Sequence, residues 1–285
     1  MDSKYRYSNI LLYKIMIDFK TIDNIMYGTA WKEDRTESLV TKAITAGFRS
    51  IDTANQRRHY YEEGVGNAIS KAIEGGIERE SFFIQTKFTH LSGQDNRLPY
   101  NPKDKIELQV KQSFDSSLQH LNIDYIDSYI LHGPSGWGVL SDDDWSTWKT
   151  MEELYNNGSV HYIGISNVNL NQLKSLYKNA NVKPTFVQNR CYALSGWDRD
   201  IRNYCNEKGI KYQGFSLLTA NQYRVKSVSV IAERLNKTPE QIIFKFSQVI
   251  GMIPLTGTTD ENHMNLDISL DFDLNTEDVD KIIKE

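Results

Sequence analysis

Three ionisable side chains of different chemistry, Asp52, Lys87 and His132, each close a short apolar run of the sequence. The runs are FRSIDTA, FFIQTKFTH and YIDSYILHG, and helix-like segments separate them, a pattern that indicates buried strands. In a parallel barrel of alternating strands and helices, the carboxyl ends of all strands point to one face, and that face carries the chemistry. We therefore expect a carboxylate, an ammonium and an imidazole to meet in one pocket.

Each of these three residues also has an ordinary structural explanation. Asp52 suits the amino cap of the helix that follows it, and Lys87 suits a strand-end lysine that reaches solvent. A lone histidine such as His132 is more often structural than catalytic. Because three such explanations would have to hold independently at three consecutive strand ends, the conjunction favours a catalytic site.

Eight strand candidates alternate with helical patterns along the chain. The expected strands are residues 24–31, 48–54, 82–88, 125–132, 160–167, 184–191, 211–218 and 251–258. The expected helices are residues 33–47, 62–76, 102–121, 142–158, 169–180, 199–209 and 229–249, the last broken at Pro239. This alternation favours a closed (β/α)8 TIM barrel of parallel strands with outer helices, in one domain over residues 1–285.

An open, doubly wound sheet is the alternative α/β fold for this pattern. A dinucleotide-binding sheet of that type carries G-x-G-x-x-G after its first strand. Here the first predicted strand ends in Gly28, Thr29, Ala30 and Trp31, so that signature is missing. In the barrel interpretation, the preceding residues ILLYKIMIDF, 10–19, are expected to form a hairpin that plugs the bottom of the barrel.

The composition excludes several classes of protein. A formal net charge of -4 gives no general attraction to nucleic acid or acidic membranes. Two cysteines, Cys191 and Cys205, are too few for a disulfide scaffold and have no metal-ligand spacing. The first twenty residues fit neither a signal peptide nor a membrane span. The expectation is a cytoplasmic protein, monomeric or a small homo-oligomer, that acts on a small molecule.

Five short motifs resemble those of the aldo-keto reductases. GFRSIDTA, the QTK of the third predicted strand, LNIDYIDSYILH, GISN and VQN occur in the family's order and at nearly its intervals, over residues 22–275. The resemblance implies a nicotinamide-dependent reductase that reduces an aldehyde or ketone to an alcohol. It also implies an active site built from an aspartate, a tyrosine, a lysine and a histidine.

The chemistry of such a site assigns a task to each residue. Hydride delivered to a carbonyl carbon leaves an alkoxide, whose oxygen needs a proton from a nearby donor. A free tyrosine has a pKa of about 10, and we expect the ammonium of Lys87 to lower it. Asp52 would keep that ammonium charged and positioned. His132 would donate a hydrogen bond to the carbonyl oxygen and orient it.

The tyrosine is harder to place than the other three residues. In the family it lies five residues after the aspartate, where this chain has Arg57. Counting back from Gly66, which resembles a glycine of the family, leads to His59, and the nearest phenol is Tyr60. We expect Tyr60 to be the proton donor, with Tyr61 as the alternative. A third alternative is that neither tyrosine reaches the site, which would make the protein a cofactor-binding regulatory or sensor subunit with little turnover.

The resemblance also implies the cofactor-binding residues. Ser166, Asn167 and Gln188 would hydrogen-bond the nicotinamide carboxamide, and Phe215 would stack beneath the ring. Further contacts to the cofactor are implied for Gly28, Thr29, Asp52, Ser216, Leu218, Leu255, Thr256, Thr258 and His263.

The last predicted strand departs from the family pattern. Many members carry a Lys-Ser pair and then an arginine, which grip the extra phosphate of NADPH. Leu255 and Thr256 stand in place of the pair, and His263 stands near the arginine. Because a neutral histidine attracts a phosphate far less than a guanidinium does, NAD becomes an alternative to the family's NADP.

Aromatic side chains from the same face are candidates for the substrate wall. Trp31 and Trp137 would surround an apolar or sugar-like carbonyl compound. No metal is expected, because a metal-dependent hydrolase built on Asp52, His59, His90 and His132 would need His-x-His or Glu-His helix motifs that the sequence lacks.

Overall fold

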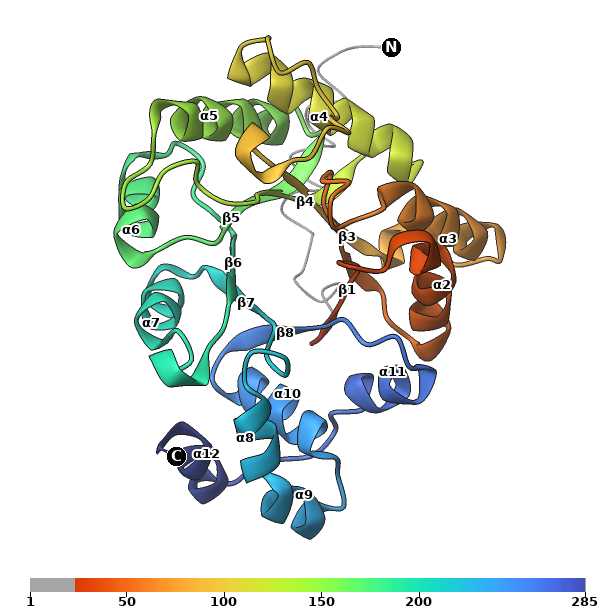
Figure 1. Cartoon of the computed structure of the whole chain (residues 1–285), viewed down its shortest axis with the longest axis vertical. Coiled ribbons are helices and arrows are strands. Elements are labelled where there is room, and N and C mark those ends of the chain that lie inside the picture. Colours follow the sequence, from red (N-terminus) through yellow and green to blue (C-terminus); the bar gives the residue numbers. More distant parts are fainter. Residues whose placement is uncertain (1–23, 285) are drawn as a thin grey trace, which may run out of the picture.

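Eight parallel strands close into a barrel in chain order, from β1 next to β2 around to β8 next to β1 (Figure 1). The computed structural model of the protein describes residues 24–284. The predicted (β/α)8 barrel is confirmed, whereas the expected hairpin at residues 10–19 lies outside the described residues. The strands are β1 (Met26–Gly28), β2 (Ser50–Asp52), β3 (Phe83–Phe88), β4 (Ile126–Leu131), β5 (Val160–Ser166), β6 (Phe186–Arg190), β7 (Lys211–Phe215) and β8 (Met252–Thr256).

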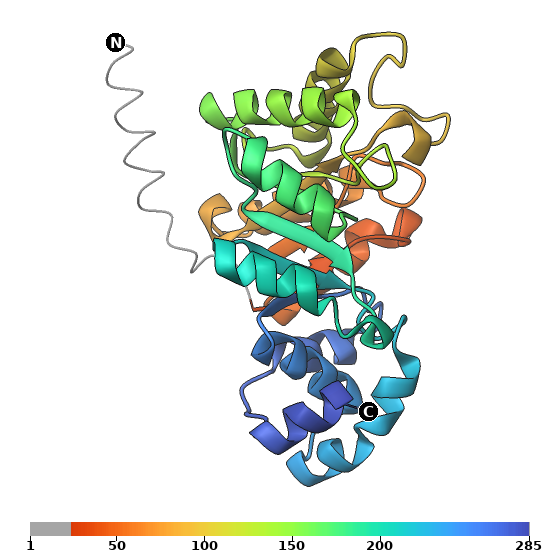
Figure 2. The same cartoon turned by 90° about the vertical axis from the view of Figure 1, so that its left-hand side faces the viewer.

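Helices cover the outside of the barrel, and the last ones gather on one side of it in both views (Figures 1 and 2). The α-helices are α2 (Thr36–Ala46), α3 (Glu62–Glu74), α4 (Ile106–Leu121), α5 (Asp142–Asn156), α6 (Leu170–Asn179), α7 (Arg199–Lys208), α8 (Gln222–Ser227), α9 (Ser229–Leu235), α10 (Pro239–Val249), α11 (Glu261–Ile268) and α12 (Thr276–Lys284). Short 3-10 helices are η2 (Glu33–Arg35), η3 (Arg79–Ser81), η4 (Leu91–Gly93) and η5 (Ala193–Ser195). Of these α-helices, α8, α11 and α12 lie outside the predicted helical segments. No helix within residues 24–284 is both long and apolar enough to span a bilayer.

Local sequence explains where several helices begin. Thr238 caps α10 through a reciprocal pair of hydrogen bonds with Gln241, and Pro239 occupies the first turn, so the break predicted at Pro239 separates α9 from α10. The helix expected from residue 102 instead begins at Ile106. The reason is a turn in which Asn101 accepts hydrogen bonds from the backbone N–H groups of Lys103 and Asp104, which takes Pro102 out of the helix.

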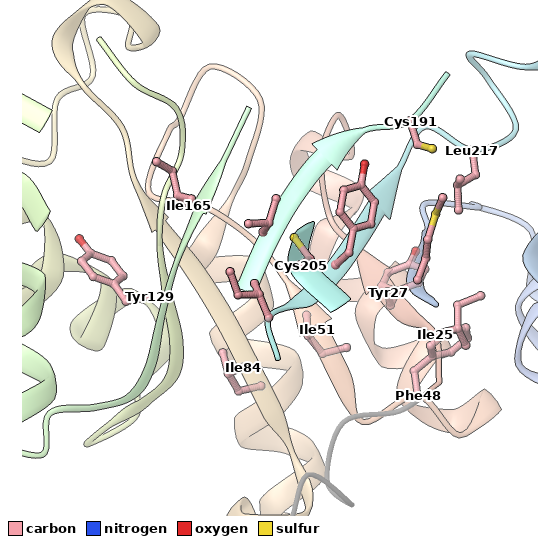
Figure 3. Packing of buried hydrophobic residues seen from close by; sticks show 14 of the residues in the cluster. Ile25, Tyr27, Phe48, Ile51, Ile84, Tyr129, Ile165, Cys191, Cys205 and Leu217 are labelled. Atoms are coloured by element: carbon pink, nitrogen blue, oxygen red, sulfur yellow. The ribbon is translucent and has the colours of Figure 1, made fainter. Parts of the chain in front are cut away.

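The barrel wall separates two kinds of packing. Side chains alternate along each strand, and Ile51, Ile84, Tyr129 and Ile165 point outward into the main core, shared with the helices (Figure 3). A smaller apolar cluster fills the barrel interior, from Met26, Phe83, Ile130, Phe186 and Leu255. Fully burying such a side chain contributes about 1.5–3 kcal/mol. The apolar interior supports the polar side chains that face the same way nearer the carboxyl ends of the strands.

Candidate active site

A cavity of about 680 Å³ opens at the carboxyl ends of the strands. Cofactor and ligand sites typically measure about 300–1,000 Å³, so the cavity is large enough for a dinucleotide. Most of the site residues expected from the sequence line it: Gly28, Trp31, Asp52, Tyr60, His132, Ser166, Asn167, Gln188, Phe215, Ser216, Leu218, Leu255, Thr256, Thr258 and His263.

Asp52 and Lys87 form a buried ion pair beneath this cavity. Lys87 Nζ donates to Asp52 Oδ1 at 2.7 Å and to the Thr53 carbonyl oxygen at 2.7 Å, and its side chain is fully buried. Burial lowers the pKa of Lys87, and the negative charge of Asp52 opposes that shift. The carboxylate and the ammonium at the ends of β2 and β3 thus meet, as the sequence predicts. The two hydrogen bonds to Asp52 and Thr53 occupy two of the three ammonium hydrogens of Lys87.

Tyr60 faces this ion pair, whereas Tyr61 does not line the cavity. The Tyr60 ring centroid lies 5.3 Å from Lys87 Nζ and 5.8 Å from the centroid of the His132 ring, which it meets edge-on. Tyr61 instead packs under the Arg57 guanidinium, 4.2 Å from its ring centroid. The geometry brings Tyr60 to the other three predicted residues, and its role as proton donor stays a prediction.

The electrostatics of Tyr60 differ from the expectation. From the sequence, we expect Lys87 to lower the pKa of the phenol. In the structure, burial and the nearby charge of Asp52 raise the pKa of Tyr60 above its ordinary value. Desolvation outweighs the ammonium because the Lys87 charge is already directed at Asp52. The phenol is therefore protonated at neutral pH, the form that can donate a proton.

His132 is a neutral imidazole at the same cavity. Burial, together with the positive charges of Lys87 and His59, lowers the pKa of His132 to about 3. Its Nδ1 lies 2.7 Å from the Thr89 hydroxyl oxygen, and its backbone oxygen accepts a hydrogen bond from Asn167 Nδ2 at 2.8 Å. When the Thr89 hydroxyl donates to Nδ1, the ring proton lies on Nε2, where it can be donated to a ligand.

The expected nicotinamide-binding residues cluster on β5, β6 and β7. Asn167, held at a φ of 53°, also donates to Ser166 Oγ at 3.2 Å. Gln188 Nε2 donates to Asp52 Oδ1 at 2.9 Å and to Gln213 Oε1 at 3.0 Å. Both of its N–H bonds are therefore used, which leaves the Gln188 carbonyl oxygen to accept from a carboxamide.

Three residues expected in the site lie elsewhere or act indirectly. Trp137 is fully exposed and does not line the cavity, because its loop folds against α6, where Gln172 donates to the Gly136 carbonyl oxygen. Thr29 is buried and donates to the Asp52 carbonyl oxygen, so it supports the site from behind. Lys87 does not line the cavity, but its ammonium is bonded to Asp52, which does.

Trp31 lies at the rim of the cavity as expected. The centroid of its ring is 3.9 Å from that of the His59 ring.

Lys32 is a cavity residue that the sequence reasoning missed. It is 2% exposed, and its ammonium donates to the Gly257 carbonyl oxygen at 2.7 Å. Burial, and to a lesser degree the charge of Arg35, lowers the pKa of Lys32 to about 8. Within residues 24–284 no carboxylate pairs with it. A buried cation without a counter-ion fits the phosphates of a dinucleotide. The sequence did indicate a place in the cavity for Lys32, because it directly follows the first predicted strand, residues 24–31.

Acidic side chains at the far end of the cavity were also missed. Glu240 and Asp267 line it beside His263. Asp267 is 4% exposed and accepts a 2.6 Å hydrogen bond from the Thr256 hydroxyl. Burial raises the pKa of Asp267 to about 6. Asp267 lies on α11, a helix outside the predicted segments, so the sequence pattern gave no signal for it.

The polar residues of the site have no arrangement typical of a metal centre. Among residues 24–284, no three or more His, Cys, Asp or Glu side chains are grouped so that they could hold a metal ion. The His90 ring instead pairs with Asp144 at 2.9 Å, at the start of α5.

Comparison with known proteins places this geometry in a family. The model of the Aldo/keto reductase family matches residues 24–224. A glyoxal reductase of Bacillus subtilis (strain 168) is 34% identical over 252 residues, 87% of this chain and 82% of the relative. A methylglyoxal reductase of Escherichia coli (strain K12) is 29% identical over 262 residues, 89% of this chain and 86% of the relative.

Solved structures show the same fold. An aldo-keto reductase from a deep-sea metagenome library has a TM-score of 0.77 and 27% identity, and the alignment covers 91% of this chain and 89% of that one. A Bombyx mori aldo-keto reductase in complex with NADP has a TM-score of 0.76 and 26% identity, covering 91% and 88%. The chain described here therefore belongs to the aldo/keto reductase family and is an NAD(P)H-dependent carbonyl reductase.

Proposed function

We propose that the protein reduces small aldehydes and ketones with Tyr60 as the proton donor. The observation that carries this proposal is the convergence of Tyr60, His132 and the Asp52–Lys87 pair at one cavity. When bound, a nicotinamide cofactor supplies the hydride that is added to the carbonyl carbon.

The protonated phenol of Tyr60 donates its proton to the carbonyl oxygen as negative charge develops there. The phenolate left behind is stabilised by the Lys87 ammonium, whose remaining N–H is free to turn toward it. Asp52 holds that ammonium in place. His132, neutral at working pH, donates a hydrogen bond that orients the carbonyl oxygen.

The cavity also supports a proposal on cofactor choice. Ser166, Asn167 and the free carbonyl oxygen of Gln188 would hold the nicotinamide, and Lys32 would neutralise the cofactor phosphates. Beside His263, a 2′-phosphate would meet Glu240 and Asp267, whereas the Arg190 guanidinium that also lines the cavity lies over the Phe215 ring. Carboxylates suit the 2′-hydroxyl of NADH. The site therefore favours NADH over NADPH.

Small dicarbonyl compounds are the proposed substrate class. The relatives named glyoxal reductase and methylglyoxal reductase match most of this chain. The rim of the cavity offers the stacked rings of Trp31 and His59 beside Tyr60, a wall for a flat, small molecule.

The testing experiment is steady-state oxidation of NADH and of NADPH with glyoxal and methylglyoxal. Turnover that exceeds the background rate with either cofactor supports the proposal. Tight cofactor binding in a fluorescence titration, with no turnover of any aldehyde or ketone, would instead support the alternative of a cofactor-binding sensor.

A further inference from the structure

Beneath the Asp52–Lys87 pair lies a buried layer of amide and hydroxyl groups, which we call the amide layer: Gln85, Ser128, Gln188 and Gln213. Gln85, Ser128 and Gln213 are completely buried, and Gln188 is 3% exposed. All four side chains point into the barrel, on the same strand faces as Asp52, Lys87 and Phe215. Phe83 and Phe186 of the apolar cluster lie two residues before Gln85 and Gln188 on β3 and β6, so the layer stands between these two rings and the catalytic end of the barrel.

Gln85 and Gln213 form a reciprocal amide pair. Gln85 Nε2 donates to Gln213 Oε1 at 2.8 Å, and Gln213 Nε2 donates to Gln85 Oε1 at 3.0 Å. The Ser128 hydroxyl adds a 2.9 Å bond to Gln85 Oε1. Because donors already surround Gln85 Oε1, the amide of Gln85 is held in one orientation, with its second N–H turned toward Asp52.

Three donors converge on one oxygen of Asp52. Gln85 Nε2 and Lys87 Nζ each lie 2.7 Å from Oδ1, and Gln188 Nε2 lies 2.9 Å from it. Gln85 and Lys87 are two residues apart on β3, so a single strand supplies both the ammonium and an amide to the same atom. Such convergence stabilises negative charge on that oxygen.

A buried ion pair can lose its charges, because burial disfavours both of them. Burial already lowers the pKa of Lys87. If the proton moved from Lys87 to Asp52, the site would lose the positive charge that the Tyr60 phenolate needs. Two amide N–H groups on Oδ1 oppose this transfer, since they bind a carboxylate more strongly than a neutral carboxyl group.

We propose that Gln85 is a positioning residue that, locked by Gln213, holds the Asp52 carboxylate against Lys87 and keeps the pair ionic during proton transfer. This inference rests on the proposed function, because it assigns Gln85 a task in the reaction of Tyr60. Gln85 itself lies below the cavity and does not line it.

The test compares two variants that differ only at Gln85, so that lost stability is not mistaken for lost positioning. The test variant combines Gln85→Met with Ser128→Ala, because the Ser128 hydroxyl would lose its acceptor when Gln85 is removed. The matched control is Ser128→Ala alone, in which Gln213 still locks Gln85. In the test variant Gln213 keeps the bond that its Oε1 accepts from Gln188 Nε2 but loses the acceptor of its own N–H group, which lowers the melting temperature. Both variants are therefore assayed well below their melting temperatures.

The first measurement is kcat with glyoxal for both variants, with cofactor affinity measured by fluorescence. We expect kcat of the test variant to be about 10- to 100-fold below that of the control, while the cofactor dissociation constants agree within about twofold. Equal kcat in the two variants would overturn the inference.

The second measurement needs no turnover. Heteronuclear NMR of the lysine side-chain nitrogens, with Lys87 assigned through Lys87→Met, reports whether Lys87 carries its third proton. We expect Lys87 of the test variant to lose that proton at lower pH than in the control, and identical titrations would contradict the inference. If the unmodified protein reduces no carbonyl compound, the proposed function is rejected, and this titration still decides the role of Gln85.

Discussion

The Lys87 ammonium lies 2.7 Å from Asp52 Oδ1 and 5.3 Å from the centre of the Tyr60 ring. It therefore stands between the carboxylate that fixes it and the phenol that we expect to donate the proton. Because the Lys87 side chain is fully buried and that of Asp52 nearly so, neither charge is screened by solvent. Each buried charge therefore depends on the other, so removal of either partner affects folding as well as the proposed reaction.

Breaking this pair from one side should destabilise the protein strongly. Lys87→Met leaves Asp52 without its counter-charge in the interior, and the expected loss is about 3–5 kcal/mol of unfolding free energy. Asp52→Asn combined with Lys87→Met should recover part of that loss, since no charge is then buried alone. Urea denaturation of both variants provides the measurement. A single variant as stable as the unmodified protein would show that the pair is not the buried contact described here.

His132 should act as a neutral hydrogen-bond donor. With its pKa at about 3, the imidazole stays uncharged from mildly acidic to alkaline pH, so it contributes no titration to the rate in that range. His132→Gln, whose amide also donates without charge, should therefore retain more activity than His132→Ala. Values of kcat/KM for the two variants across pH measure this. If His132→Gln were the less active of the two, the donor role would be wrong.

Lys32 should make cofactor binding depend on pH. Its pKa of about 8 means that the ammonium is charged below that pH and neutral above it. Attraction to the cofactor phosphates is therefore present at neutral pH and lost as the pH rises through about 8. Fluorescence titrations at a series of pH values should show this loss, and Lys32→Met should bind weakly at all of them. Lys178→Met, on the exposed face of α6, is the matched control and should keep the normal pH dependence.

His263 should control the choice between the two cofactors. It is exposed at the rim of the far end of the cavity, near the acids Glu240 and Asp267. His263→Arg supplies the guanidinium that the last strand region lacks, and a charge-assisted contact of this kind strengthens NADPH binding by about tenfold. NADH affinity should change little. A variant that improves both cofactors equally would mean that His263 does not face the 2′ position.

Much of the fold could be predicted because each strand carries its own signal. The runs around Ile51, Ile84 and Ile165 are short, apolar and bounded by polar residues, and each became a barrel strand. Helix α4 shows the limit of such reasoning: Pro102 is compatible with a helix start, but the side chain of Asn101 forms a competing turn.

The candidate site was predictable only where position along a strand determines direction. Asp52 is the last residue of β2 and Lys87 is the last but one of β3, so their inward-facing side chains lie at the carboxyl ends of the strands. The partners of Gln85 depend on register across the barrel, since Gln213 is 128 residues away in sequence. Side chains alternate along a strand, so Gln85 must face inward with Lys87 on β3. This alternation does not indicate which groups Gln85 contacts there. The prediction that Trp137 lines the cavity was wrong, because the direction of a loop side chain does not follow from its position along a strand.

The central claim is that Tyr60, and not Tyr61, gives its proton to the substrate. The direct test is single-turnover reduction of glyoxal by the Tyr60→Phe and Tyr61→Phe variants, each saturated with reduced cofactor. We predict that Tyr60→Phe slows the chemical step by about 100-fold or more, while Tyr61→Phe stays within about threefold of the unmodified protein, as expected for a surface contact with Arg57. Undiminished reduction by Tyr60→Phe would contradict the account.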